Sequence, residues 1–185
     1  LIALVTVGVV MVGFPYLTFL PTLADERFDV GAVGYGVMSG VAGLGAVAAG
    51  LINASRGRGL RPWATIALSG TAFGVALIAL GVANSYPLAL VALAFIGASG
   101  LMFQTSTQTL LLRISALEYH GRLQSMVILG FSGFGLMALP LGVLADAVTL
   151  RTTLAAMGVA VLTTIALFAA ARYRHRGRVA AVEIG

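Results

Sequence analysis

The sequence lacks cysteine and lysine, and it contains few charged residues of any kind. Without cysteine the chain has no disulfide, no thiolate metal ligand and no thiol nucleophile. Only 9% of its 185 residues are charged, whereas a soluble globular domain carries about 25%. Hydrophobic residues make up 59% of the chain, which is the opposite of the composition of a disordered protein. An integral membrane protein is the class that remains.

Six apolar runs are each long enough to cross a membrane as a helix. A transmembrane helix needs about 20 apolar residues, whereas transmembrane strands have about 9–11 residues of alternating polarity. The runs here are longer and do not alternate, and only helices and closed barrels satisfy their backbone in lipid. We therefore predict an all-α membrane protein with spans at residues 1–24, 31–52, 63–83, 88–112, 123–145 and 152–171.

The first apolar run begins at once, at Leu1, which is not an initiator methionine. A secretory signal would have a basic start and a shorter apolar core. We therefore expect the sequence to begin inside or just before a membrane helix.

The loops of the six predicted spans lie alternately on the two sides of the membrane, and the arginines are distributed unevenly between these sides. Nine of the eleven lie in the second loop, the fourth loop or the tail at residues 172–185. Basic residues stay on the cytoplasmic side of a membrane. We therefore expect both termini in the cytoplasm, with the tail as a topological anchor that binds no nucleic acid. Arginine without lysine, beside much Ala, Gly and Val, is typical of a bacterial chain, which indicates the bacterial cytoplasmic membrane.

The fourth span contains a polar block, Gln-Thr-Ser-Thr-Gln-Thr, inside an apolar run. Gln104 and Gln108 are four residues apart and share one helix face. A buried amide is costly unless it is hydrogen-bonded. Two readings stay open: a cavity or gate to which Gln104, Thr105 and Gln108 contribute, or hydrogen bonds that hold helices together. Gln124 and Ser132 in the fifth span are further candidates for the same space.

The second span is rich in glycine and contains two pairs of small residues four apart, Gly36/Gly40 and Ser39/Gly43. Small residues let membrane helices approach closely. The pairs indicate either helix packing alone or a sliding contact that repacks during transport.

Ionisable residues are absent from the middle third of every span. A charged group there would indicate a proton relay or an ion site. The sequence therefore predicts no ion-coupling residue, no metal and no cofactor in this chain. Enzymatic activity is not expected either, because no His, Asp and Glu residues cluster; His120 has only Glu118 nearby, and a lone loop histidine is usually solvated.

The six spans, with polar residues on the fourth and fifth, resemble one half of a major facilitator superfamily transporter. Such halves consist of two inverted three-helix units. The segment from Gly50 to Arg58, with an inner Gly57, resembles the G-x-L-A-D-R-x-G-R-R loop motif of this superfamily, although Ala54 replaces the acid. This replacement puts in doubt any gate that would depend on that acid.

Two further motifs carry the same resemblance. The segment from Gly142 to Asp146, with Arg151 after it, resembles the G-x-L-A-D…R ending before the last helix. The segment from His120 to Met126 resembles R-G-R-V-x-S-M at the start of the eleventh helix, with Arg122 as its second basic residue.

The opening run, with Pro15-Tyr16-Leu17 and Pro21, resembles the siderophore and drug exporter branch, the transmembrane secretion effectors. The resemblance implies helices seven to twelve of twelve, which pair with an N-terminal six-helix half in the lipid bilayer. It also implies alternating-access export of an amphiphilic small molecule, with protons as a candidate coupling ion for an antiporter.

Within that scheme the first, second, fourth and fifth spans would line the cavity, and the third and sixth would brace the outside. Arg113 and Arg122 would flank the cytoplasmic mouth. The alternative is an independent six-helix protein that homodimerises or pairs with another half and has a binding or assembly role.

Overall fold

The computed structural model describes residues 2–55, 62–133, 139–143, 145 and 148–182. These residues form helices and connecting turns, with no strand among them. Five helical stretches are long and apolar enough to cross a membrane: Val5–Arg27, Gly31–Ser55, Trp63–Val82, Tyr86–Ile114 and Leu150–Ala171. They coincide with five of the six predicted spans, so the all-helical membrane class is confirmed.

The predicted span at residues 123–145 is the exception. Helix α6 covers His120–Ser132, after a short 3-10 turn, η3, at Leu117–Tyr119. Residues 139–143 are helical again, and residues 134–138 lie outside the described part of the chain. A sixth crossing and the inverted three-helix repeats therefore stay predictions.

The first span is not one regular helix. It consists of α1 (Ile2–Gly13), α2 (Tyr16–Thr22) and a π-helical turn, η1 (Leu23–Arg27). The break falls at Pro15, which has no backbone N–H to continue the ladder of helical hydrogen bonds. The proline therefore divides the first span into two helical segments.

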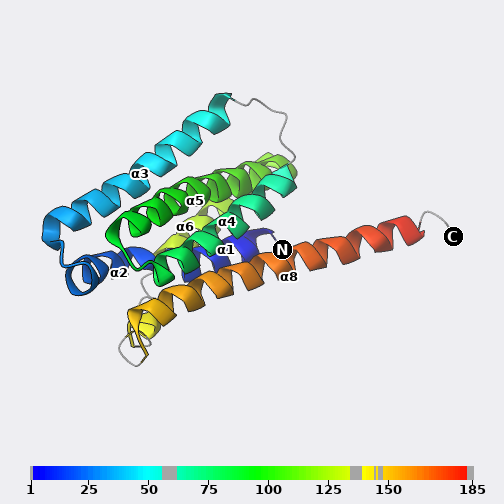
Figure 1. Ribbon diagram of the computed structural model, residues 1–185. Helices are drawn as coiled ribbons and strands as arrows, with labels where there is room; N and C mark the ends of the chain where they lie inside the picture. Colours follow the sequence, from blue (N-terminus) through cyan, green and yellow to red (C-terminus); the bar gives the residue numbers. More distant parts are fainter. Residues whose placement is uncertain (1, 56–61, 134–138, 144, 146–147, 183–185) are drawn as a thin grey trace.

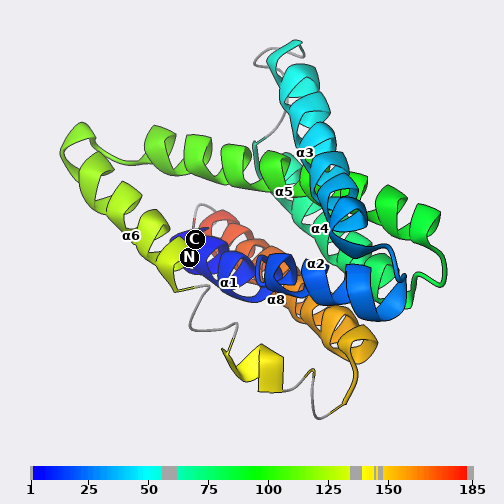
Figure 2. The same cartoon turned by 90° about the vertical axis from the view of Figure 1, so that its left-hand side faces the viewer.

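Four long helices lie side by side in the order α3 (Gly31–Ser55), α5 (Tyr86–Ile114), α4 (Pro62–Val82) and α8 (Leu150–Val182), as Figure 1 shows. Helix α1 packs against α6 and α8, which can be followed in Figure 2. Helix α8 also continues beyond the last predicted span, through most of the Arg-rich tail.

Small residues set the close helix contacts. A Cβ atom added at Gly97 of α5 would lie 1.9 Å from the carbonyl oxygen of Ala42 on α3, and one added at Gly45 would lie 2.1 Å from that of Ala94. The α4–α8 contact is similar, since a Cβ atom at Gly158 would lie 2.6 Å from the Gly74 oxygen. Lipid is as apolar as the side chains, so close packing of this kind holds membrane helices together.

Helix α4 packs between α5 and α8, and its other side, with Leu68, Val75 and Val82, is exposed. Half of its most apolar window is buried, against 17% for α3, and its Phe73 and Leu77 are almost fully enclosed. The family resemblance implies that this span braces the outside of a transporter, and this stays a prediction. The uniform hydropathy of α4 marks no inward side, and its position therefore becomes visible only in the fold.

Candidate functional site

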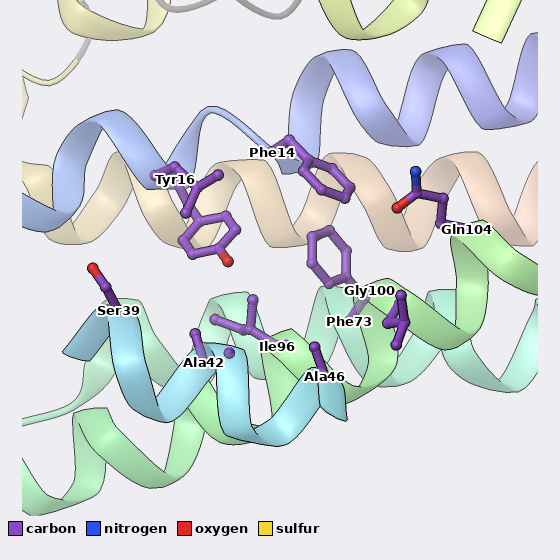
Figure 3. A pocket seen from close by; sticks show the side chains of 13 residues that line it. Phe14, Tyr16, Ser39, Ala42, Ala46, Phe73, Ile96, Gly100 and Gln104 are labelled. Atoms are coloured by element: carbon purple, nitrogen blue, oxygen red, sulfur yellow. The ribbon is translucent and has the colours of Figure 1, made fainter. Parts of the chain in front are cut away.

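A cavity of about 280 Å³ lies between the broken first helix, α3, α4 and α5. Figure 3 shows its labelled side chains: rings on one side, small residues on the other, and Gln104 at the end away from Ser39. Three of the four spans that the family resemblance placed around the cavity contribute to it. The fourth contributor is α4, through Phe73, and no described residue of the fifth predicted span lines the cavity.

One wall of the cavity is aromatic. The ring of Phe14 lies 5.7 Å from that of Phe73, and the ring of Tyr16 meets Phe73 edge-on at 6.4 Å. Positions two apart on a regular helix point to nearly opposite sides. The break at Pro15 removes that constraint, and both rings therefore reach the same partner. Tilted and edge-on arrangements are those that aromatic pairs favour.

The opposite wall is made of small residues at helical spacing. Ser39, Ala42, Gly43 and Ala46 follow the i, i+3, i+4, i+7 pattern on α3, so they share one face. A Cβ atom at Gly43 would meet nothing within 4 Å among the described residues. The lack of side-chain volume on this wall leaves the space open.

Gln104 is the one amide among the described residues that line the cavity. No hydrogen bond of its side chain is recorded among the described residues, whereas the hydroxyl of Thr105 donates to its own helix at Leu101 O, 2.8 Å away. Thr107 does the same with Phe103 O at 2.6 Å. The amide of Gln104 is therefore available to a bound molecule or to water, and the hydroxyl protons are not.

The other polar candidates do not line this cavity. Gln108, one turn along α5, and Gln124 on α6 are half-buried elsewhere. Thr105 is also absent from the lining. The side chain of Ser132 lies outside the described part of the structure. The shared face of Gln104 and Gln108 thus reaches the cavity at one residue only.

The charged motif residues are not brought to the cavity either. Arg113 and Arg122 are exposed near the α5–α6 connection. Gly57, Arg58 and Asp146 fall outside the described residues. Gly50 and Gly142 are half-buried away from the cavity. The lining within the described chain is therefore uncharged.

Arg151 and His120 contact carbonyl groups at helix ends. Arg151 donates from Nε to Gly81 O and from Nη2 to Val82 O, both at 3.3 Å. His120 Nε2 lies 3.0 Å from Leu112 O, so this histidine packs on the end of α5 rather than standing free in solvent as expected.

A second cavity, of about 320 Å³, lies between α4 and α5 and is lined only by Ala, Val, Leu and Phe side chains. It offers no polar group to a ligand. Among the described residues, no three His, Cys, Asp or Glu side chains lie together in a way that could hold a metal ion.

Sequence reasoning missed the aromatic wall. The available signal was the order Phe14-Pro15-Tyr16, a helix breaker between two rings, which permits both rings to turn to one side. The partner ring, Phe73, carried no signal of its own because it stands in a uniformly apolar span.

Comparisons with known proteins give one match. Residues 5–182 match the family described as transmembrane secretion effector. Comparisons with curated proteins and with solved structures found no match. The family match covers nearly the whole chain, including every residue of the cavity wall. The chain therefore belongs to the transmembrane secretion effector family of the major facilitator transporters.

Proposed function

We propose that this protein exports an amphiphilic small molecule by secondary active transport, and that the cavity beside Phe73 and Gln104 forms part of the substrate path. Family membership supports transport or secretion across a membrane. The observation that carries the assignment to this cavity is the free amide of Gln104 beside an aromatic wall. This role involves no enzymatic step and no cofactor.

The lining favours a substrate that is apolar over most of its surface and uncharged where it meets this chain. Aromatic and small apolar side chains cover the walls, and a buried charge without a partner would be costly there. The amide and the Ser39 hydroxyl, at opposite ends of the cavity in Figure 3, can bond to polar groups at the ends of such a molecule. An amphiphilic drug-like or siderophore-like compound fits this description.

The chain acts, in this proposal, as the C-terminal half of an alternating-access transporter. The open side of α3 supports this, since only 17% of its most apolar window is buried. A second six-helix half covering that side would close the cavity, and the two halves would rock around it. The coupling ion, for which protons are the candidate, would bind to residues of that second half. Both termini would face the bacterial cytoplasm.

Filling the cavity tests the transport path directly. Gly43→Leu adds a side chain to the small-residue wall, where a Cβ atom would meet no described residue within 4 Å, so we expect the fold to accept it. Gly40→Leu is the matched control, because a Cβ atom at Gly40 also meets nothing and Gly40 does not line the cavity. We expect Gly43→Leu to reduce efflux of an uncharged fluorescent amphiphile, such as Nile red, to the level of cells without the protein.

The control variant should keep the parental efflux rate at equal amounts of protein in the membrane. Equal efflux by the parent and Gly43→Leu would remove this cavity from the path. If the control lost efflux as well, the open side of α3 would be an essential contact rather than part of the path.

A further inference from the structure

Two arginines that are far apart in the sequence meet at one helix end. Arg27, the last residue of η1, donates from Nη2 to Ala83 O. Arg151, near the start of α8, donates to Gly81 O and Val82 O. Three successive carbonyl groups at the end of α4 are thus occupied by side chains from two other segments.

The end of α4 needs such donors. The last carbonyl groups of a helix have no partner within the helix, and the helix dipole favours positive charge there. Helix α4 has no basic residue in its own last turn. Arg151 also donates to Asn84 Oδ1 at 3.0 Å, immediately beyond the helix. The two arginines supply what the α4 sequence lacks.

The two guanidinium groups bond to neighbouring carbonyl groups, Arg27 to Ala83 O and Arg151 to Val82 O. Within the described chain, neither forms an ion pair with an acidic side chain. Arg27 lies over the ring of Phe28, 5.8 Å from its centroid, and both charges interact with carbonyl groups at the end of α4.

The contact bears on the cavity through the broken first helix. Helix α4 packs far more extensively on α5 and α8 than on α1. The first span touches α4 where Phe14 and Tyr16 meet Phe73, and again at Arg27. Because the helix is interrupted at Pro15, its backbone hydrogen bonds alone do not fix α2 and η1. Buried side chains such as Leu20 and Leu23 hold these segments, and Arg27 holds their far end.

We propose that Arg27 and Arg151 are positioning residues that clamp α2 and η1 to the end of α4 and thereby keep Tyr16 on the cavity wall beside Phe73. The proposal concerns the same cavity as the proposed function. It makes no use of transport, because it describes the resting arrangement of the helices.

The test measures a distance across the clamp in the full-length protein in lipid nanodiscs. These 185 residues contain no cysteine, so spin labels can be placed at Asp25→Cys and Ser85→Cys, which are both exposed. Electron–electron double resonance should give a narrow distance distribution for the parent. Arg27→Gln should broaden it toward longer distances, and Arg27→Lys, which keeps one charged donor, should restore it in part.

A second readout follows the cavity wall. Ala42→Cys replaces a wall residue that is only 8% exposed, and its maleimide labelling should become several times faster when the clamp is lost. Arg113→Gln is the control, because this exposed arginine lies at the other end of α5. If Arg27→Gln does not fold, Arg151→Lys should give a smaller broadening, since an ammonium cannot match the fork of donors on Arg151.

An unchanged distance distribution with unchanged labelling of Ala42→Cys would overturn the proposal. A lower melting temperature with an unchanged distance distribution would also overturn the proposal. Such a result would mean that the two arginines stabilise the fold without positioning α2 and η1. Both readouts are taken without substrate or gradient, so they stand apart from any failure of the transport proposal.

Discussion

Within the polar block of α5, hydroxyl and amide side chains differ in their hydrogen bonds. A threonine or serine hydroxyl can reach a carbonyl group one turn back on its own helix, as Thr105 and Thr107 do. No such bond is recorded for the amide of Gln104, which instead faces the cavity. Six polar residues in a row therefore reduce to one polar group on the wall.

This difference predicts unequal effects of two similar substitutions. Gln104→Leu should weaken binding of a transported amphiphile by roughly 2- to 10-fold, the value of one ordinary hydrogen bond. Gln108→Leu should leave it close to the parental value, because Gln108 lies off the cavity. Equilibrium binding to purified protein in nanodiscs measures both. A larger loss with Gln108→Leu than with Gln104→Leu would contradict the assignment.

Helix α3 uses its small residues in two different ways. Gly45 lies against the backbone of α5, as Gly97 of α5 does against α3. Gly36, Gly40 and Gly43 meet nothing within 4 Å among the described residues. The small-residue pairs that the sequence singled out, Gly36/Gly40 and Ser39/Gly43, thus lie on the open and cavity-lining sides, and the close contact uses other glycines.

The two kinds of position should respond oppositely to alanine. Gly97→Ala would force the α3 and α5 backbones apart and should lower the free energy of unfolding by about 1–3 kcal/mol, the usual cost of overpacking. Gly36→Ala should raise it by about 0.5–1 kcal/mol, because alanine favours helix more than glycine does. Unfolding in mixed detergent micelles gives both values. A stabilising Gly97→Ala would show that the helices separate more easily than their contact indicates.

The molecule as a whole leaves one of its long helices largely uncovered. Helix α3 stands at the edge of the bundle, and large apolar side chains such as Val33, Leu44 and Leu51 are exposed along it. Lipid can cover such a surface. The cavity lies beside this helix, however, and a transport path needs a wall on every side. The arrangement therefore favours a second helical half against α3.

That reasoning predicts the size of the native protein. An antibody against residues 172–185 should detect a band at about twice the 18.9 kDa calculated for this sequence. A band near 18.9 kDa would contradict a fused transporter and would favour the alternative, in which a second copy or a separate half covers α3. Native electrophoresis in mild detergent would then distinguish a homodimer from a mixed pair.

The fold was predictable to the level of the spans. Five long apolar runs appear as helices at nearly the expected residues, since a run of this length can satisfy its backbone in lipid only in that way. The span at residues 123–145 was harder to predict. It begins beside His120, Arg122 and Gln124, and it then contains glycines and Pro140, which weaken a helix. Of the candidate cavity residues whose side chains the structure describes, only Gln104 reaches the cavity.

The sequence by itself determined that this protein lies in a membrane and where five of its helices cross, because hydropathy and length decide whether a segment enters lipid. The tertiary structure decided which faces meet. In water an apolar stripe marks the inside of a helix, but in lipid every face is apolar and the pattern carries little such information. The packing of α4 between α5 and α8, the aromatic wall around Phe73 and the meeting of Arg27 with Arg151 therefore depend on backbone fit and helix ends, which become defined only when the helices pack.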